Sequence, residues 1–271
     1  MYKILAPLII ICLFWCCNGT NNETVEDNNN PNPAPPVLTY NILKVYPHDT
    51  SSYTEGLVFF NNALYESTGN KGKSRLRKIN IETGKPEKDI QLADEYFGEG
   101  IAILNNKIYQ LTWQEHKVFV YDADTFEKIQ EMAWPFDGWG MTQNGKELII
   151  GTGGSILYFV NPENLKINKT ISVTDNYGPV GDVNELEYVN GFIYANVYGT
   201  HFIFKINAET GKVEAKIDLT HILSSSGIPH DAALFGSDSN YVLNGIAYDS
   251  TKNSFFVTGK WWPAMFEIQL N

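Results

Sequence analysis

The chain has 271 residues, of which 43% are hydrophobic, 13% aromatic and 19% charged, a balance typical of a folded globular protein and not of a disordered, collagenous or coiled-coil one. The 20 Lys and Arg residues are outnumbered by 31 Asp and Glu residues, so the formal net charge is -11. Because the protein has no excess of positive charge to neutralise phosphates or anionic lipids, we expect no nucleic-acid partner.

Residues 1–17, MYKILAPLIIICLFWCC, combine an early lysine with a short apolar run, as in an export signal. All 3 cysteines, at positions 12, 16 and 17, lie inside this segment, so the rest of the chain offers neither a disulfide framework nor a zinc cluster. A cysteine followed by a polar stretch is similar to the end of a bacterial lipoprotein signal. We therefore predict a periplasmic or cell-envelope lipoprotein anchored at Cys16 or Cys17. The bulky residues before those cysteines leave plain secretion, or an uncleaved anchor, as alternatives.

Residues 18–38 are rich in Asn and Pro and contain too few apolar residues to form a core. They predict a disordered tether between the export signal and a folded domain over residues 39–271. A lipid at the N-terminal cysteine would then be the only membrane contact.

From residue 40 onward, short runs of alternating β-branched and aromatic residues are separated by Asn-Gly and Asn-Asn turns. Five of these runs resemble one another: EGLVFFNNALYEST, EGIAILNNKIYQLT, WGMTQNGKELIIGT, NELEYVNGFIYANV and NGIAYDSTKNSFFVT. They begin at Glu55, Glu99, Trp139, Asn184 and Asn244. Each one predicts a strand, a tight turn and a returning strand.

A second signature follows each of the first four runs, as INIETGK, YDADTFEK, VNPENLK and INAETGK. It predicts a third strand and a turn into a fourth, so that one repeat is a four-stranded antiparallel unit. Five such units of about 40 to 50 residues predict an all-β fold, a five-bladed β-propeller. The longer interval before Asn244 predicts an insertion, HILSSSGIPHDAALFGSDSN, as an irregular loop with one helical turn.

The fifth repeat has room for only three strands before residue 271. The unassigned strand YNILKVYP at residues 40–47 can supply the fourth, which would close the ring by joining the two ends of the domain in one blade. Closure also removes open sheet edges that would invite aggregation. A closed ring needs no partner subunit, so we expect a monomer.

The two faces of such a propeller differ in this sequence. One face receives ordinary turn residues, whereas the other receives the entries to each first strand and the loops after each second strand, including FGEG, FDGWG, LTWQEHK and TGKWWPA. Aromatic, acidic, amide and basic groups therefore converge on the second face around the axis. Such a set predicts a pocket for a small molecule or a peptide terminus.

The motifs YTEGL, ESTG, FGEG, YQLTW, DGWG, NELEY, NGIAYD and TGKWWP occur in an order and spacing that resemble the plant and bacterial glutaminyl-peptide cyclotransferases, which are five-bladed propeller enzymes. The resemblance extends from about residue 40 to residue 270. It implies conversion of the N-terminal glutamine of a peptide or protein to pyroglutamate with release of ammonia, without a metal or another cofactor. The histidines show no metal-ligand spacing, which agrees with this implication.

This reaction requires the α-amine to attack the side-chain amide of its own residue, and it requires a group that moves protons. Glu99 in FGEG matches the catalytic acid of the family, and aromatic neighbours would raise its pKa by desolvation. Lys260 in TGK and Asn184 in NELEY match further catalytic positions, as donors to the amide oxygen or to the developing oxyanion. Candidate substrate-binding residues implied by the same match are Trp113, Trp139, Trp262, Gln110 and Asn244.

One position departs from the family. The usual pattern at the entry to the first blade is F-T-Q-G, whereas this chain has Tyr53-Thr54-Glu55-Gly56. If Glu55 lines the same pocket, it could attract the substrate amine or couple to Glu99, and it could equally hold the amine protonated. We expect retained activity with an altered pH profile.

Two other functions remain open at this point, because a fold does not establish an activity. One is a propeller that binds a peptide or a carbohydrate without catalysis. The other is a metal-dependent, lactonase-like propeller, for which Glu55, Glu99, Asn184 and Asn244 could serve as axial ligands. Replacement of Glu99 distinguishes the first alternative, and a chelator distinguishes the second.

Overall fold

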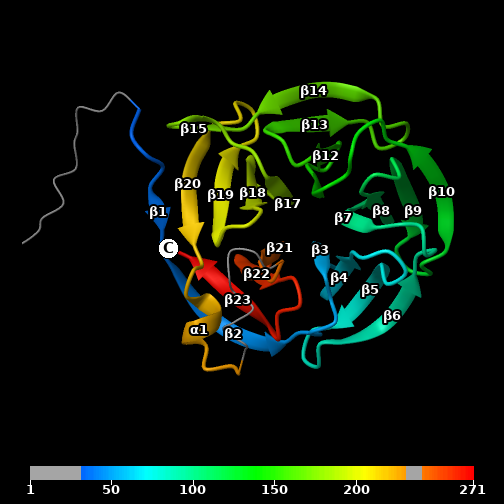
Figure 1. Ribbon diagram of the computed structural model, residues 1–271, viewed down its shortest axis with the longest axis horizontal. Coiled ribbons are helices and arrows are strands. Elements are labelled where there is room, and N and C mark those ends of the chain that lie inside the picture. Colours follow the sequence, from blue (N-terminus) through cyan, green and yellow to red (C-terminus); the bar gives the residue numbers. More distant parts are fainter. Residues whose placement is uncertain (1–31, 230–239) are drawn as a thin grey trace, which may run out of the picture. The chain divides into compact units, whose positions relative to one another are not determined.

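The computed structural model describes residues 32–229 and 240–271. In this part of the chain, strands form five small antiparallel sheets that surround a central axis, so the predicted five-bladed β-propeller is confirmed (Figure 1). The predicted export signal and most of the predicted tether, residues 1–31, lie outside the described residues. Among the described residues, no helix has the length and apolar character needed to cross a membrane.

Each blade is built from the axis outward in chain order, with the single exception of the last blade. The innermost strands are β3 (Thr54–Phe60), β7 (Gly98–Leu104), β11 (Met141–Gln143), β17 (Val183–Val189) and β21 (Leu243–Asp249). The second strands are β4 (Ala63–Thr68), β8 (Lys107–Thr112), β12 (Leu148–Gly151), β18 (Phe192–Val197) and β22 (Ser254–Gly259).

The two outer layers complete the blades. The third strands are β5 (Arg75–Asn80), β9 (Lys117–Asp122), β13 (Ile156–Val160), β19 (Phe202–Asn207) and β23 (Ala264–Leu270). The fourth strands, counted from the axis, are β6 (Lys85–Gln91), β10 (Lys128–Ala133), β14 (Ile167–Ser172), β20 (Val213–Asp218) and β2 (Tyr40–Pro47). A two-stranded hairpin of β15 (Thr174–Asp175) and β16 (Gly178–Pro179) lies between the third and fourth blades in the chain.

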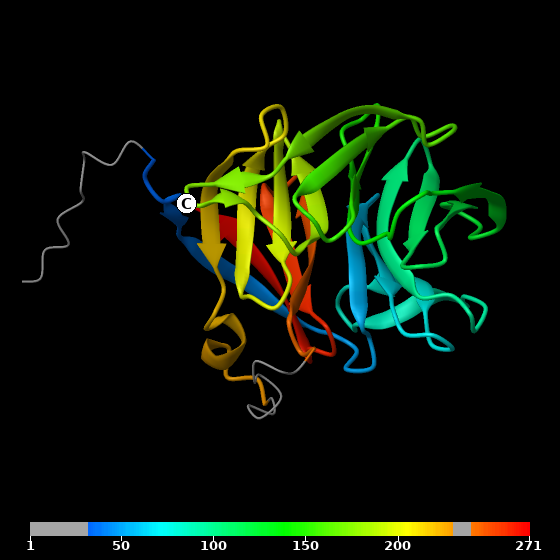
Figure 2. The same cartoon turned by 45° about the horizontal axis from the view of Figure 1, so that its top comes forward.

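The predicted closure of the ring is confirmed. Strand β2 pairs antiparallel with β23, from Tyr40 opposite Leu270 to Pro47 opposite Ala264. Figures 1 and 2 show this as a blue strand beside the red end of the chain. The last blade therefore takes its outermost strand from the start of the domain, which holds the first and last blades together.

The tether is shorter than its composition predicted, which corrects the domain boundary. Val37 and Leu38 form strand β1, which pairs parallel with Lys216 and Ile217 on the outer edge of β20. The main chain of Pro36 also accepts a hydrogen bond from the amide of Lys216, at 2.9 Å. An outermost strand has an unpaired edge, and two apolar residues after a proline-rich segment are enough to use it. Composition alone does not reveal such an edge.

The predicted insertion contains one short helix, α1 (Ile222–Ser225), whose Ile222 and Leu223 are buried against the fourth and fifth blades. Residues 230–239 of the insertion lie outside the described residues. The predicted hairpin turns are confirmed where two asparagines meet. Asn61 and Asn62 have φ angles of 49° and 59°, the left-handed pair that a type I′ turn requires.

Glycines at the starts of the innermost strands allow neighbouring blades to approach closely around the axis. A Cβ atom placed on Gly140 would lie 1.9 Å from the carbonyl oxygen of Asn184, and one placed on Gly100 would lie 2.5 Å from the amide nitrogen of Met141. No side chain fits at either distance. The second glycine of the FGEG and DGWG motifs is therefore a packing requirement of the ring.

We expect Gly140→Ala to reduce the free energy of unfolding by about 2–4 kcal/mol, because the added methyl group must displace the main chain of the neighbouring blade. Urea unfolding followed by tryptophan fluorescence measures this loss. Gly154→Ala is the matched control, since a Cβ atom at that position meets nothing within 4 Å. Equal stability of the two variants would contradict the packing argument.

Two glutamates of β17, the buried Glu185 and the half-buried Glu187, connect neighbouring blades. The carboxyl oxygens of Glu185 accept the main-chain amides of Leu57 at 3.2 Å and Ile246 at 2.8 Å, so one side chain links three blades. Glu187 accepts the amide of Tyr248 at 3.0 Å. Burial raises the pKa of Glu187 to about 8 and that of Glu185 well above its usual range, where the neighbouring Glu187 charge adds to the effect.

The raised pKa of Glu187 predicts a stability that falls with rising pH. An unfolded glutamate loses its proton near pH 4.5, whereas the folded one holds it to about pH 8, so the folded state is penalised progressively between these values. We expect Glu187→Gln to reduce this slope by up to about 1 kcal/mol per pH unit. Urea unfolding of both proteins from pH 5 to pH 8.5 tests this, and parallel curves would show that Glu187 does not carry the effect.

Candidate active site

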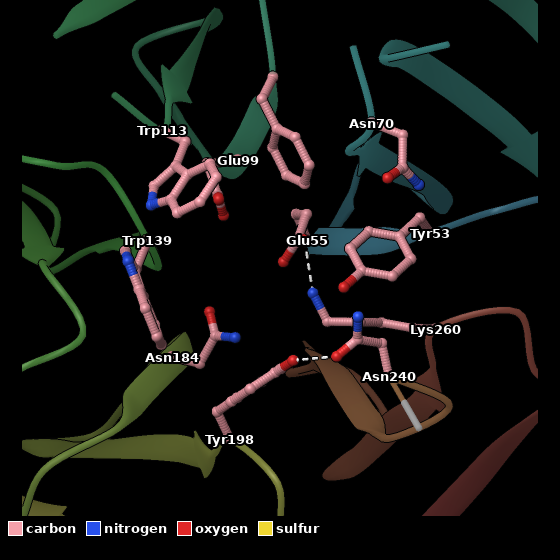
Figure 3. A pocket seen from close by; sticks show the side chains of 11 residues that line it. Tyr53, Glu55, Asn70, Glu99, Trp113, Trp139, Asn184, Tyr198, Asn240 and Lys260 are labelled. Atoms are coloured by element: carbon pink, nitrogen blue, oxygen red, sulfur yellow. Dashed lines mark hydrogen bonds and ion pairs between the residues drawn. The ribbon is translucent and has the colours of Figure 1, made fainter. Parts of the chain in front are cut away.

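A pocket opens on the face that receives the entries to the innermost strands. Its cavity volume is about 360 Å³, within the range of small-molecule sites. Its side chains converge on the axis and come from all five blades (Figure 3). The lining residues are Tyr53, Glu55, Asn70, Phe97, Glu99, Trp113, Trp139, Asn184, Tyr198, Asn240 and Lys260.

Three polar residues of the pocket occupy equivalent positions in different blades. Glu55, Glu99 and Asn184 are each the second residue of an innermost strand, in β3, β7 and β17. The pairing register of all three strands shifts at that point, as it does in β21 at Asn244. A local bulge of this kind redirects a side chain out of the regular alternation of a strand. The repeated irregularity is therefore what turns three polar side chains toward the same space.

Lys260 and Glu55 form a buried ion pair at the centre of the pocket (Figure 3). The Lys260 side chain is 2% exposed, and its Nζ atom lies 4.1 Å from the ring centroid of Tyr53 and 5.7 Å from that of Tyr198. Carboxylate and aromatic faces together compensate the loss of water around the ammonium. Asn244 donates from below through its Nδ2 atom to Glu55, at 3.3 Å.

Main-chain hydrogen bonds fix the loop that carries Lys260. The amide of Trp261 donates to the carbonyl of Ser52 at 2.7 Å, and Nδ1 of His48 lies 2.7 Å from the carbonyl oxygen of Trp262. Nε2 of His48 is in turn 2.9 Å from the buried carboxylate of Glu66. The connection between β2 and β3 thus positions Lys260 from the blade next to it.

Glu99 is buried and lines the same pocket as Glu55. Burial raises the pKa of Glu99 well above its usual range, the negative charges of Glu55 and Glu115 raise it further, and Lys260 opposes the shift. The raised pKa favours the protonated form of Glu99 inside the pocket, which is the property of a general acid.

Aromatic rings form the walls of the pocket. Phe97 and Trp113 meet edge to face at 5.6 Å between centroids, and Trp139 and Tyr198 meet in the same way at 5.9 Å. Trp113 and Trp139 face the space in which Glu99 lies (Figure 3). These walls exclude water from one side of any bound molecule, which strengthens the electrostatic interactions inside.

Asn184 reaches the pocket with a side chain that is 3% exposed. Its Oδ1 atom has no hydrogen-bond partner among the described residues. A buried amide oxygen without a partner is costly in a folded protein unless a ligand satisfies it. Asn184 can therefore offer a bound molecule an acceptor as well as the donor that the sequence suggested.

Three predicted substrate-binding residues lie outside the lining of this pocket. Gln110 is fully buried and donates to Ser67 of the preceding blade at 2.8 Å, Asn244 supports Glu55 from behind, and Trp262 packs in the core edge to face against Phe266. They hold blades or pocket residues in place. Glu55, Glu99, Trp113, Trp139, Asn184 and Lys260, by contrast, are brought together as the sequence indicated.

Five lining residues were not named as site residues from the sequence, namely Tyr53, Asn70, Phe97, Tyr198 and Asn240. All five lie in segments that were assigned to this face, which was the available signal. Tyrosine, phenylalanine and asparagine are common in cores and turns, so residue type alone did not distinguish them. Tyr198 donates a hydrogen bond to Oδ1 of Asn240, which joins two loops at the rim (Figure 3).

Within residues 32–229 and 240–271, no three or more His, Cys, Asp or Glu side chains are grouped so that they could hold a metal ion. The position beside the Glu55 carboxylate is occupied by the Lys260 ammonium.

Comparison with known proteins finds the same enzyme class at the levels of family, sequence and structure. A family described as "Glutamine cyclotransferase" matches residues 10–270. The chain is similar to the glutaminyl-peptide cyclotransferase of Arabidopsis thaliana, with 36% identity over 231 residues, which is 84% of this chain and 70% of that protein. It is also similar to the crystal structure of Myxococcus xanthus glutaminyl cyclase, with a TM-score of 0.78, 31% identity and coverage of 88% of this chain and 98% of that one.

Proposed function

Because the chain belongs to the glutamine cyclotransferase family, we propose that it converts an N-terminal glutamine of peptides or proteins to pyroglutamate with release of ammonia. The observation that carries the mechanism is the buried Glu99, whose pKa is raised by its surroundings, in one aromatic-walled pocket with Lys260. The chain is therefore an enzyme of the glutaminyl-peptide cyclotransferase type, as its motifs implied.

The pocket is suited to holding a folded-back glutamine. Trp113 and Trp139 enclose the side chain, so that the α-amine and the amide carbon remain in contact, which is an intramolecular advantage. Asn184 and Lys260 bind the amide oxygen and stabilise the negative charge that develops on it during attack. Glu99 gives a proton to the departing nitrogen, which leaves as ammonia.

The depth of the pocket agrees with a terminal residue as the substrate. Glu55, Glu99, Asn184 and Lys260 are buried, whereas Asn70 and Tyr198 are partly exposed and Asn240 is exposed. One residue can enter, and the rest of the peptide then leaves along the rim. Selection beyond the first residue would depend on these rim side chains.

We also infer that the reaction needs no metal ion. A catalytic metal would supply a positive charge next to the developing oxyanion, and in this pocket the Lys260 ammonium already occupies that position beside Glu55. The predicted export signal at residues 1–17 further suggests a periplasmic or cell-envelope lipoprotein, or a secreted protein. The closed ring of blades suggests that this protein acts as a monomer.

Mass spectrometry of a peptide that begins with glutamine tests this function directly. We expect loss of ammonia from that peptide, at an unchanged rate after chelation of divalent metals, and no change in a matched peptide that begins with alanine. Membrane fractionation of the expressing cells, with a Cys16→Ser, Cys17→Ser control, tests the anchor separately.

A further inference from the structure

Glu55 introduces a second carboxyl group into the site. It lines the same pocket as Glu99, both side chains are almost completely buried, and the charge of Glu55 acts on Glu99. Within the described part of the chain, Lys260 is the one cation that pairs with either of them, through Glu55. Two buried acids and one ammonium thus meet in a single pocket.

Charge balance determines how many protons this group holds. With both carboxyls ionised, the three residues would carry one uncompensated negative charge in a water-poor site, which is costly. With one proton on the pair, the group is neutral. A carboxyl pair with one shared proton is the usual result when two acids lie in contact.

The surroundings also determine which acid holds the proton. Glu55 accepts from Nζ of Lys260 and from Nδ2 of Asn244, so its ionised form is stabilised. Glu99 lies beside Trp113 and has no ion pair among the described residues, so its neutral form is favoured (Figure 3). At rest, Glu55 is then the base and Glu99 the acid.

We propose that Glu55 and Glu99 divide acid and base catalysis between them, holding one proton as a pair. This inference rests on the proposed function and adds a second catalytic residue to it. The substrate reacts as the neutral amine, whose nitrogen attacks the amide carbon and becomes positively charged. Glu55 takes one proton from that nitrogen, and Glu99 gives its proton to the amide nitrogen.

The step is balanced in atoms and charge. The bond between the amide carbon and its nitrogen breaks, ammonia leaves, and the oxygen of the intermediate returns to a carbonyl. The pair still holds one proton, which has moved from Glu99 to Glu55. Transfer between the two carboxyls returns it, so no exchange with bulk water is needed between turnovers.

Other charged and titratable groups act on this pair from the elements packed against it. Glu115 of the loop after β8 acts on Glu99, and Lys71 pairs with Glu115 at 2.8 Å. Glu185 of β17 and Glu55 act on one another through the axis. The hydroxyls of Tyr53 and Tyr198 lie nearby, and burial raises the pKa of both, so they stay neutral in the working range.

Glu55→Gln, compared with Glu115→Gln, separates direct sharing from general electrostatics. We expect Glu55→Gln to lower kcat/KM because the base is lost, and to shift the alkaline limb of the pH profile to lower pH by about one unit or more, because the carboxylate that raises the pKa of Glu99 is removed. The value of kcat/KM at pH 8 then falls at least about tenfold. Glu115→Gln removes a negative charge without removing the partner, so we expect a clearly smaller shift.

The outcomes distinguish this inference from the function on which it rests. A profile of Glu55→Gln equal to that of the unmodified protein, or a shift no larger than that of Glu115→Gln, overturns the proton pair while ammonia release still supports the enzyme. Absence of ammonia release from the unmodified protein overturns the function itself. Carboxyl ¹³C spectra of the unmodified protein, assigned with the Glu55 and Glu99 variants, provide a second test. Coupled titration supports the pair, and independent titration of Glu99 overturns it.

Discussion

Replacement of Glu99 by glutamine is expected to lower kcat for a glutaminyl peptide by about 10³-fold, with a much smaller effect on KM. Glutamine has nearly the same shape and keeps the walls of the pocket, but it cannot release a proton to the departing nitrogen. The amide would remain a poor leaving group, so the loss concerns the transition state rather than binding. Continuous measurement of ammonia release at several peptide concentrations separates kcat from KM.

Stability provides the control for this variant. Since the pKa of Glu99 is raised in the folded state, its carboxyl group makes the protein less stable as pH increases above 4.5. Glu99→Gln removes that penalty, and we expect it to be at least as stable as the unmodified protein at pH 8. An inactive but stable variant points to chemistry. Activity within tenfold of the unmodified protein would exclude Glu99 as the acid.

The fold followed from the sequence because its repeats are local. Each Asn-Asn or Asn-Gly turn requires left-handed residues, and the strands around it alternate, so the blade could be identified without long-range information. The position of the pocket also followed, since strand order alone decides which loops share a face. The pairing of Val37 and Leu38 with β20 could not be predicted, because it depends on which edge the ring leaves open.

The direction of individual side chains was less predictable. In the motif TGKWWP, Trp261 has a φ angle of 61°, a left-handed conformation that is rare for a bulky residue. The chain reverses there, so Lys260 lines the pocket while Trp262 packs against Gly259 and into the core. If both tryptophans are assumed to lie in one regular turn, the sequence does not show which of them packs in the core.

The bulges at the innermost strands illustrate the same limit. Glu55, Glu99 and Asn184 begin repeats in the sequence, but the register shift that turns them toward the axis appears only in the pairing of the strands. Gln110 lies in a regular part of β8, and its amide bridges to Ser67 of another blade instead of reaching the substrate. The three bulged residues and Gln110 are all buried polar residues, and only the local backbone distinguishes their roles.

Lys260→Met is expected to lower kcat by about 10²–10³-fold, because it removes the positive charge that stabilises the oxyanion while keeping most of the side-chain volume. It is also expected to destabilise the protein at pH 8 by about 3–5 kcal/mol, since Glu55 is then left as a buried carboxylate without its partner. Steady-state ammonia release and urea unfolding measure the two losses on the same preparation.

The double variant Glu55→Gln, Lys260→Met separates the two roles of the lysine. Removing both members of the ion pair leaves no unpaired charge, so we expect most of the lost stability to return. The oxyanion still lacks its cation, so we expect kcat to stay low. Because Glu55→Gln alone also lowers activity, the double variant is compared with Glu55→Gln. If their kcat values are equal, Lys260 serves only to hold Glu55. If stability returns but kcat stays well below that of Glu55→Gln, the ammonium acts on the substrate, and Asn184 alone is insufficient to stabilise the charge on its oxygen.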